Sequence, residues 1–182
     1  MKFLPLEIPG AFLVELERRQ DSRGFFARSW CRDEFKNHGL NPNLVQCNVS
    51  YNESKGTLRG MHFHKSLSKE AKLVRCTRGA IFDVIVDLRR ESPSFRSWRG
   101  FELNESNHLS LYVPEGCAHG FLTLEDRTEV FYQMSDPYEP NMGSGIAWDD
   151  PEIGIEWPIP GPYLLSEKDA TWPKFEDFFP NE

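Results

Sequence analysis

The sequence lacks any long hydrophobic run, any cluster of basic residues and any CxxC cysteine pair. No stretch approaches the roughly 18 apolar residues that a membrane-spanning helix requires. The segment from Met1 to Gly10 also lacks the basic region and apolar run that mark a secretion signal. These absences predict a cytoplasmic protein that does not enter a membrane.

The few cysteines and the acidic net charge exclude further classes of protein. The four cysteines stand in unrelated contexts, which predicts reduced thiols and neither a disulfide framework nor a zinc site. A net charge of -7 without a long basic run argues against nucleic acid as the main partner. A small anion remains possible, because a few arginines and lysines in one cleft can hold a diphosphate.

Length and composition are those of an ordinary globular protein. A chain of 182 residues, with 39% hydrophobic and 27% charged residues, predicts one domain that spans 1–182 and buries its own core. Aromatic residues make up 13%, a high share that indicates ring-lined cavities or interfaces.

Short apolar runs separated by glycine and proline predict β structure. The segment 75–88 reads as a strand, an Arg-Gly turn and a second strand, in which apolar residues alternate imperfectly with two aspartates: Ile81, Asp83, Val84, Val86 and Asp87. Further strands are expected at 97–103, 109–113, 120–124 and 129–134. Such close spacing predicts an all-β sandwich or barrel. Two short helices are expected, at 32–38 with Gly39 as its cap and near Ser166.

Side chains capable of chemistry gather in a few segments. His62 and His64 lie two residues apart in an extended run and so point to one face, as do Glu70 and Lys72 on the next strand. A tight Pro-Glu-Gly turn then delivers His119. Taken singly, most such residues pack or form structural hydrogen bonds.

Taken together, these segments resemble the dTDP-4-dehydrorhamnose 3,5-epimerase family over most of the chain. The motifs are DSRGFF from residue 21, QCNVS from 46, LRGMHF from 58, KLVRC from 72, PEGCAHGF from 114, FYQMSDPY from 131, WDDPEIGIEWP from 148 and LSEKD from 165. The resemblance implies an all-β fold, the double-stranded β-helix or cupin jelly roll. It also implies a homodimer in which strands cross between subunits, and neither a metal nor an organic cofactor.

The resemblance also implies roles for single residues. His62 corresponds to the base, Asp169 to the carboxylate beside it and Tyr132 to the acid. Lys72 and His119 correspond to other residues of the sugar site. The residues expected to contact the nucleotide or its phosphates are Arg23, Gln46, Asn48, Arg59 and Lys168. The expected substrate-binding set is completed by Phe26, His64 and Tyr138.

These roles agree with the chemistry of carbons beside a ketone. Removing a proton there leaves an enolate, so the site needs a base, a group that stabilises the oxyanion and an acid on the opposite ring face. His62 suits the base, with Asp169 fixing its tautomer, while Lys72 faces the oxyanion and Tyr132 returns the proton. We therefore expect inversion at C3, C5 or both of a nucleotide-diphosphate-linked 4-keto-6-deoxy sugar. The pathway would be deoxysugar or surface-polysaccharide biosynthesis, for example that of rhamnose.

Three positions depart from the family pattern. The family commonly has an acidic residue where this chain has Arg28, and another where it has Gly143. Loss of both carboxylates indicates either a base other than thymine, as in a GDP- or CDP-linked substrate, or neutral drift at an open rim. His64 stands where the family usually has glutamine, and a neutral histidine can still donate and accept hydrogen bonds.

Two other kinds of protein compete with this interpretation. Metal-dependent cupin oxygenases or isomerases use two histidines, a glutamate and a later histidine, which this chain offers as His62, His64, Glu70 and His119. Against a metal site, Glu70 follows His64 at an unusually long distance, and Lys72 would bring a second positive charge. An inert sugar-nucleotide-binding jelly roll would keep the arginines but has no need of the acid and base. The sequence does not decide between C3, C5 and both.

Overall fold

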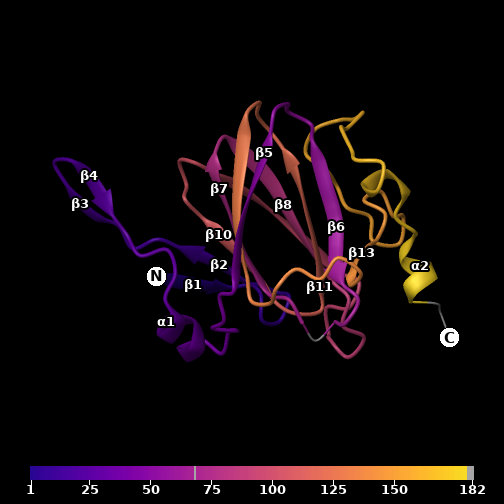
Figure 1. Ribbon diagram of the computed structural model, residues 1–182, viewed down its shortest axis with the longest axis horizontal. Helices are drawn as coiled ribbons and strands as arrows, with labels where there is room; N and C mark the ends of the chain where they lie inside the picture. Colours follow the sequence, from indigo (N-terminus) through magenta and orange to yellow (C-terminus); the bar gives the residue numbers. More distant parts are fainter. Residues whose placement is uncertain (68, 180–182) are drawn as a thin grey trace.

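Two antiparallel sheets face each other in the computed structural model, which describes residues 1–67 and 69–179 (Figure 1). The strands are β1 (Lys2–Pro5), β2 (Phe12–Glu15), β3 (Arg19–Asp21), β4 (Gly24–Phe26), β5 (Gln46–Asn52), β6 (Leu58–His64), β7 (Lys72–Arg78), β8 (Ala80–Asp87), β9 (Trp98–Asn104), β10 (Ser110–Val113), β11 (Cys117–Thr123), β12 (Thr128–Met134) and β13 (Gly143–Gly145). Three short helical segments accompany them: α1 (Arg32–Asn37), the 3-10 helix η1 (Asp169–Thr171) and α2 (Phe175–Phe178).

The larger sheet has the strand order β1-β2-β10-β7-β12-β5, and the smaller sheet has the order β13-β6-β11-β8-β9. Strands β3 and β4 pair with each other and form a hairpin that projects from the barrel as an arm (Figure 1). The prediction of an all-β jelly roll with a few short helices is confirmed. In the described part of the chain, no helix is long and apolar enough to cross a membrane.

The predicted strands are present, with some shifted ends. The turn expected in 75–88 falls at Gly79, whose φ of +74° favours glycine and whose added Cβ would lie 2.6 Å from Oγ1 of Thr128. Strand β11 begins at Cys117, three residues earlier than expected. His119 therefore lies on a strand, whereas the sequence had indicated that it belongs to the preceding turn.

Strand β8 differs from the alternation read in the sequence, because both of its faces are buried. Ile81 and Ile85 belong to the core between the sheets, whereas Val84 and Val86 pack in the layer outside the smaller sheet. The aspartates of this strand are fully buried and lie on the inner face. A strand that is buried on both faces does not alternate apolar and polar residues. Its aspartates are shielded from water and therefore need partners inside the protein.

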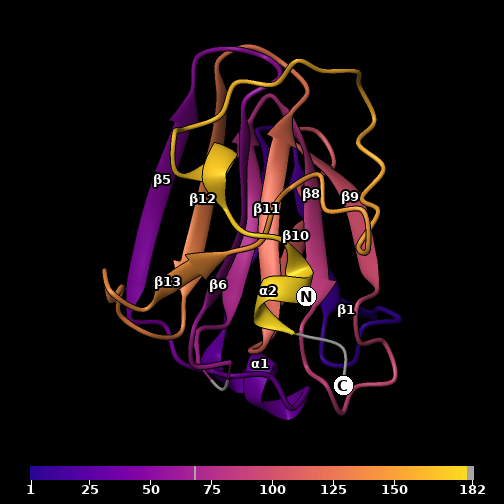
Figure 2. The same cartoon turned by 90° about the vertical axis from the view of Figure 1, so that its right-hand side faces the viewer.

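The C-terminal segment covers the outer face of the smaller sheet, as Figures 1 and 2 show. Phe175 and Phe179 stack with their ring centroids 4.8 Å apart and pack against Val84, Val86 and Met61. Burying one such side chain contributes about 1.5–3 kcal/mol. This layer holds η1 against β6. The helix expected near Ser166 corresponds in place to η1, whereas α2 was not predicted.

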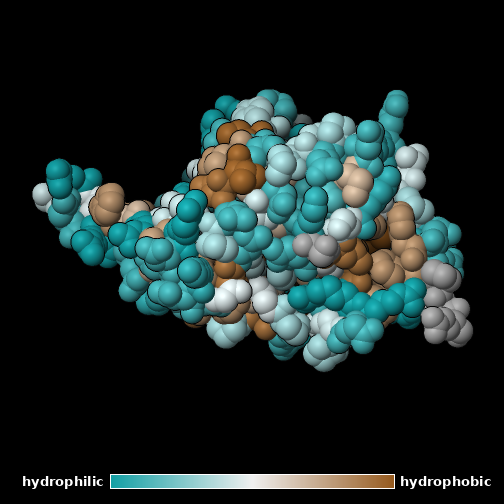
Figure 3. All heavy atoms as spheres, turned by 60° about the horizontal axis from the view of Figure 1, so that its bottom comes forward, coloured by the Kyte–Doolittle hydropathy of each residue, from teal (hydrophilic) through white to brown (hydrophobic). Residues whose placement is uncertain are grey.

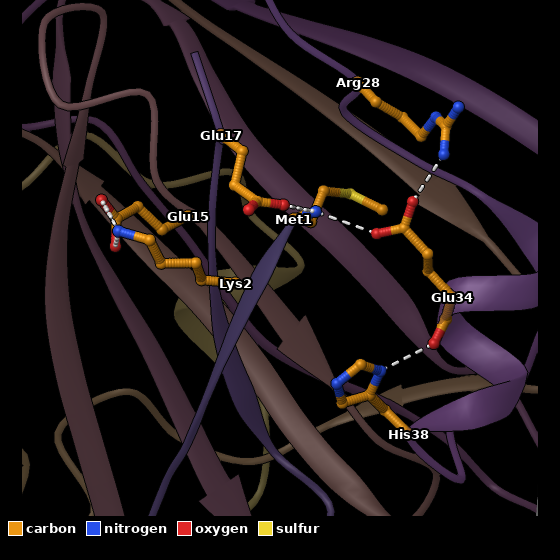
Figure 4. A network of polar contacts seen from close by, with 7 residues as sticks. All are labelled: Met1, Lys2, Glu15, Glu17, Arg28, Glu34 and His38. Carbon is orange, nitrogen blue, oxygen red and sulfur yellow. Dashed lines mark hydrogen bonds and ion pairs between the residues drawn. The ribbon is translucent and has the colours of Figure 1, made fainter.

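Helix α1 packs at the root of the arm. Phe35 is buried there, with its ring centroid 5.3 Å from that of Phe3. Glu34 accepts hydrogen bonds from the ammonium of Met1 at 2.9 Å and from Arg28, which follows the arm, at 2.7 Å (Figure 4). Water screens ion pairs near the surface, so the buried ring is the main anchor of the helix. Gly39 ends this helix at a φ of +71°, as predicted.

Candidate active site

A cavity of about 470 Å³ opens between strands of both sheets and the segment that carries η1. Its walls come from β5, β7 and β12 of the larger sheet and from β6 and β13 of the smaller sheet. A second cavity of about 180 Å³ extends it toward His119 and Phe121. The two cavities share the residues Arg59, His62, Lys72 and Tyr132, so they form one site.

His62 on β6 and Asp169 at the start of η1 form a hydrogen-bonded pair. Nε2 of His62 lies 2.6 Å from Oδ1 of Asp169, and the same oxygen accepts a hydrogen bond from Nε1 of Trp172 at 3.1 Å. Burial alone would raise the pKa of Asp169, but hydrogen bonds from His62, Trp172 and Ser166 and the charge of His62 outweigh it and lower the pKa. An ionised carboxylate on Nε2 leaves Nδ1 of His62 as the nitrogen that can accept a proton.

Gly145 allows Trp172 to reach this pair. Gly145 lies on β13 directly opposite His62 of β6. A Cβ on Gly145 would lie 2.5 Å from the indole ring of Trp172, which is closer than side chains pack. Nζ of Lys168 lies 4.8 Å from the centroid of the same ring. The glycine thus supports the position of the carboxylate through the tryptophan.

Tyr132 and Lys72 line the same cavity from β12 and β7. Burial raises the pKa of Tyr132, and the negative charge of Glu70 raises it further. Among the described residues the phenol has no hydrogen-bond partner, so its proton is available to a ligand. Nζ of Lys72 forms an ion pair of 2.9 Å with Oε1 of Glu70, and both side chains are nearly buried. A base, a cation and a protonated phenol therefore share one cavity.

His119 belongs to a second histidine–carboxylate pair. Its Nε2 lies 2.8 Å from Oδ1 of Asp83, which is completely buried on the inner face of β8. Within the described chain, Oδ2 of Asp83 has no hydrogen-bond partner. A buried carboxylate needs a hydrogen-bond partner inside the protein, and Nε2 of His119 is the partner that Oδ1 of Asp83 has.

The two histidines occupy paired positions on neighbouring strands. His119 of β11 is the register partner of His62 of β6, and paired residues project to the same face of a sheet. The strands approach closely here because Gly60 and Gly120 lack side chains, and a Cβ on Gly60 would lie 2.6 Å from Cα of Gly120. This contact explains why glycines accompany both histidine motifs.

Polar side chains surround the rest of the large cavity. Gln46 donates a hydrogen bond of 3.1 Å to Oδ1 of Asn48, and its own Oε1 accepts one of 3.0 Å from the backbone of Tyr138. Nε of Arg59 donates to Oδ1 of Asn52 at 2.7 Å. The structure thus brings these predicted substrate-binding residues to the cavity that holds His62: Gln46, Asn48, Arg59, Tyr138 and Lys168.

Three predicted substrate contacts do not line either cavity of the chain that carries them. Arg23 and Phe26 lie on the projecting arm, where their exposed fractions are 88% for the Arg23 side chain and 72% for Phe26. Arg23 pairs with Asp21 at 2.6 Å. His64 is buried, and its Nδ1 accepts a hydrogen bond of 3.1 Å from the backbone of Ser66. His64 lies two residues from His62 on β6, as the expected common face requires, but its ring lines neither cavity.

The four side chains of the competing metal-site hypothesis have separate partners. His62 pairs with Asp169, His119 with Asp83, and Glu70 with Lys72, while His64 bonds to backbone atoms. Within residues 1–67 and 69–179, no group of three or more His, Cys, Asp or Glu side chains is placed to hold a metal ion. The predicted metal ligands do not converge on one point.

Comparisons with known proteins give the family. The family model described as dTDP-4-dehydrorhamnose 3,5-epimerase matches residues 5–177. A dTDP-4-dehydrorhamnose 3,5-epimerase of Methanothermobacter thermautotrophicus is 42% identical over 173 residues, which cover 94% of this chain and 92% of the relative.

Solved structures agree with this result. The dTDP-4-dehydrorhamnose 3,5-epimerase of Bacillus anthracis, crystallised with TDP and PPi bound, superposes with a TM-score of 0.91 at 41% identity, covering 96% of this chain and 99% of that one. ChmJ of Streptomyces bikiniensis, a 3'-monoepimerase in complex with dTDP-quinovose, superposes with a TM-score of 0.88 at 30% identity. The match covers 97% of this chain and 90% of ChmJ. The chain belongs to the dTDP-4-dehydrorhamnose 3,5-epimerase family.

Proposed function

We propose that the chain is an epimerase that inverts C3, C5 or both of a nucleotide-diphosphate-linked 4-keto-6-deoxy sugar. The observation that carries the proposal is the placement of the His62–Asp169 pair, Lys72 and Tyr132 around one cavity. The names of the similar enzymes support the same reaction and a place in deoxysugar biosynthesis, with dTDP-4-keto-6-deoxyglucose as the first candidate substrate.

The proposed reaction moves protons and leaves the other bonds of the sugar unchanged. Nδ1 of His62 takes the proton from a carbon beside the C4 ketone, and the electron pair of that C–H bond moves to form the enolate. The ammonium of Lys72 stabilises the oxyanion on O4, because a cation inside a partly desolvated cavity acts more strongly than in water, and His119 lines the same part of the cavity. Tyr132 then donates its proton to the opposite face of the same carbon. His62 releases its proton and the tyrosinate regains one, both by exchange with water.

The residues proposed to bind the nucleotide and its phosphates supply cations and amides at the rim. Arg59 and Lys168 can hold the diphosphate, and Gln46 and Asn48 offer donors and acceptors to the remaining groups. The TDP complex of the Bacillus anthracis relative supports thymine as the base. A GDP- or CDP-linked sugar stays an alternative, because Gly143 leaves open space where an acidic residue is common in the family.

We further propose a homodimer in which the arm of each chain completes the cavity of its partner. The arm carries Arg23 and Phe26 away from the barrel (Figure 1), so their expected contact with the substrate requires a second chain. Apolar side chains also remain exposed on the edge strand β5, among them Val49 and Tyr51. Figure 3 shows apolar atoms gathered on the barrel beside the base of the arm. The one-domain organisation and the cytoplasmic location stay predictions.

Solvent exchange tests the proposed function. The protein would be incubated in deuterated water with dTDP-, GDP- and CDP-linked 4-keto-6-deoxy sugars, and NMR would report deuterium and configuration at C3 and C5. We expect exchange with inversion for at least one nucleotide, and His62→Asn should abolish both. Absence of exchange with every nucleotide would contradict the proposal. A metal found in stoichiometric amount and required for turnover would instead favour the metal-dependent alternative.

The same spectra decide which carbon reacts. ChmJ is a 3'-monoepimerase with the same fold, so family membership alone does not distinguish single from double epimerisation. Deuterium at both carbons indicates a 3,5-epimerase, and deuterium at one carbon identifies a monoepimerase.

A further inference from the structure

Glu70 places a negative charge inside the cavity of an enzyme whose proposed substrate is itself negative. Its side chain is 11% exposed and lines the cavity together with His62 and Tyr132. Its Oε1 lies 2.9 Å from Nζ of Lys72, whose side chain is 12% exposed. A carboxylate that is nearly buried needs a strong partner, and the ammonium of Lys72 is that partner.

The backbone of Glu70 is held in a conformation that glutamate rarely adopts. Its φ is +70°, in the left-handed region where a Cβ is unfavourable. Its N–H donates a hydrogen bond of 3.3 Å to Oδ2 of Asp136, and the next N–H, of Ala71, donates one of 2.8 Å to Oγ of Ser135. The Ser135 hydroxyl in turn donates to Asp136 at 2.7 Å. Such strained residues persist where the surrounding structure holds them, and they are frequent at functional sites.

We propose that Glu70 is a positioning residue for the reaction: it holds the ammonium of Lys72 in the cavity and adds a negative charge beside Tyr132. The inference rests on the proposed function, because it assigns Lys72 to the oxyanion and Tyr132 to the acid. In the empty enzyme Glu70 balances the charge of Lys72. When the enolate forms, the same ammonium faces two negative partners and stays fixed between them.

The charge of Glu70 also affects the proton of Tyr132. Burial raises the pKa of this phenol, Glu70 and Tyr138 raise it further, and Arg59 lowers it. The other titratable groups that line the two cavities with Tyr132 include Lys72, His62 and His119. Removing the charge of Glu70 therefore lowers the pKa of Tyr132, so the acid loses its proton at a lower pH.

The variant Glu70→Gln tests this role, because it keeps the length and the acceptor oxygen but removes the charge. We expect kcat to fall roughly tenfold, with KM changing less. The alkaline limb of the kcat profile should move to lower pH by about one unit, the size of effect that a neighbouring charge has on a partly buried group. The control Glu129→Gln removes one negative charge from β12 outside the cavity, and its profile should match that of the parent protein.

A titration without substrate measures the same effect independently of turnover. The ultraviolet absorbance of tyrosinate would be followed against pH in the parent and in Glu70→Gln, each with its Tyr132→Phe counterpart subtracted to isolate Tyr132. A lower pKa of Tyr132 in Glu70→Gln supports the inference. An unchanged pKa together with an unmoved alkaline limb overturns it, even if the parent protein epimerises. Absence of solvent exchange in the parent would instead overturn the proposed function.

Discussion

Asp169 and His62 are 107 residues apart in the chain, and their side chains meet at 2.6 Å. The contact depends on the C-terminal segment, whose buried phenylalanines hold η1 against β6. The base of the proposed reaction is therefore completed by the last part of the described chain. Three variants test the site that contains this pair, and a fourth tests the buried carboxylate Asp87 at the end of β8.

Asp169→Asn removes the charge and keeps the size of the side chain. The amide can no longer stabilise an imidazolium, so kcat should fall roughly 100-fold or more, within the range of general base catalysis. NMR of the His62 imidazole should show changed chemical shifts in the variant, because the carboxylate that contacts Nε2 has become an amide. Full activity in Asp169→Asn would show that the pair has no part in the reaction.

Tyr132→Phe separates proton removal from inversion. The base can still take a proton and return deuterium to the same face, so exchange at the first reacting carbon should continue in deuterated water. Inversion should be lost, because the opposite face has no donor. NMR of recovered sugar nucleotide measures both quantities in one sample. Inversion at an undiminished rate would show that the phenol is not the acid.

Gly145→Ala should disturb Asp169 without touching it. The new methyl group would lie 2.5 Å from the Trp172 ring, so the indole must move and its hydrogen bond to Asp169 weakens. We expect kcat to fall roughly tenfold or more, because a small misplacement of a reacting group lowers the rate. The NMR signal of His62 should also change. Gly143→Ala adds the same group to the same strand in open space, and the His62 signal should stay as in the parent. Equal His62 signals in Gly145→Ala and Gly143→Ala would contradict the proposal that Gly145 supports Asp169 through Trp172.

Asp87→Asn should lower stability in a pH-dependent manner. Burial alone would raise the pKa of Asp87, but hydrogen bonds from Arg89, Ser92 and Ser94 outweigh it and lower the pKa. A carboxyl group with a lowered pKa in the fold stabilises the protein above its unfolded pKa of about 4, and this contribution is lost as the pH falls through the folded value.

The expected loss in Asp87→Asn at neutral pH is roughly 3 kcal/mol, because one partner of a buried ion pair is removed. Denaturant unfolding at a series of pH values measures it, and the difference from the parent should shrink below pH about 4. The exposed Asp149→Asn serves as the control and should change little at any pH. A loss independent of pH would indicate that shape, and not charge, is what Asp87 supplies.

Much of the fold could be predicted from the sequence, because strands separated by turn residues leave a local signal. Gly79 marks a turn that both the pattern and the structure contain. The inner position of Asp83 could not be predicted, because β8 is covered on its second face by a segment some ninety residues further along the chain. The alternation of apolar and polar residues along one strand does not show whether a distant segment covers its second face.

The candidate site shows the same division. Motifs placed His62, Lys72 and Tyr132 on separate strands, and the structure brings them to one cavity. The support given by Trp172 was missed, because its partner glycine lies on β13, a strand of three residues without a clear pattern. His64 is buried and lines neither cavity, because periodicity assigns a residue to a face of a strand and does not determine which residues of that face line a cavity.

The distance between the His62 and His119 rings depends on the absence of side chains at Gly60 and Gly120. A methyl group added at either glycine would push β6 and β11 apart, and the two histidine rings would move with their strands. Changes around the cavity can therefore alter which sugar or base is accepted and leave the gap between the histidines as it is, whereas a side chain at either glycine would widen that gap. Variation among relatives of this chain should accordingly collect at the rim and avoid the seam between these two strands.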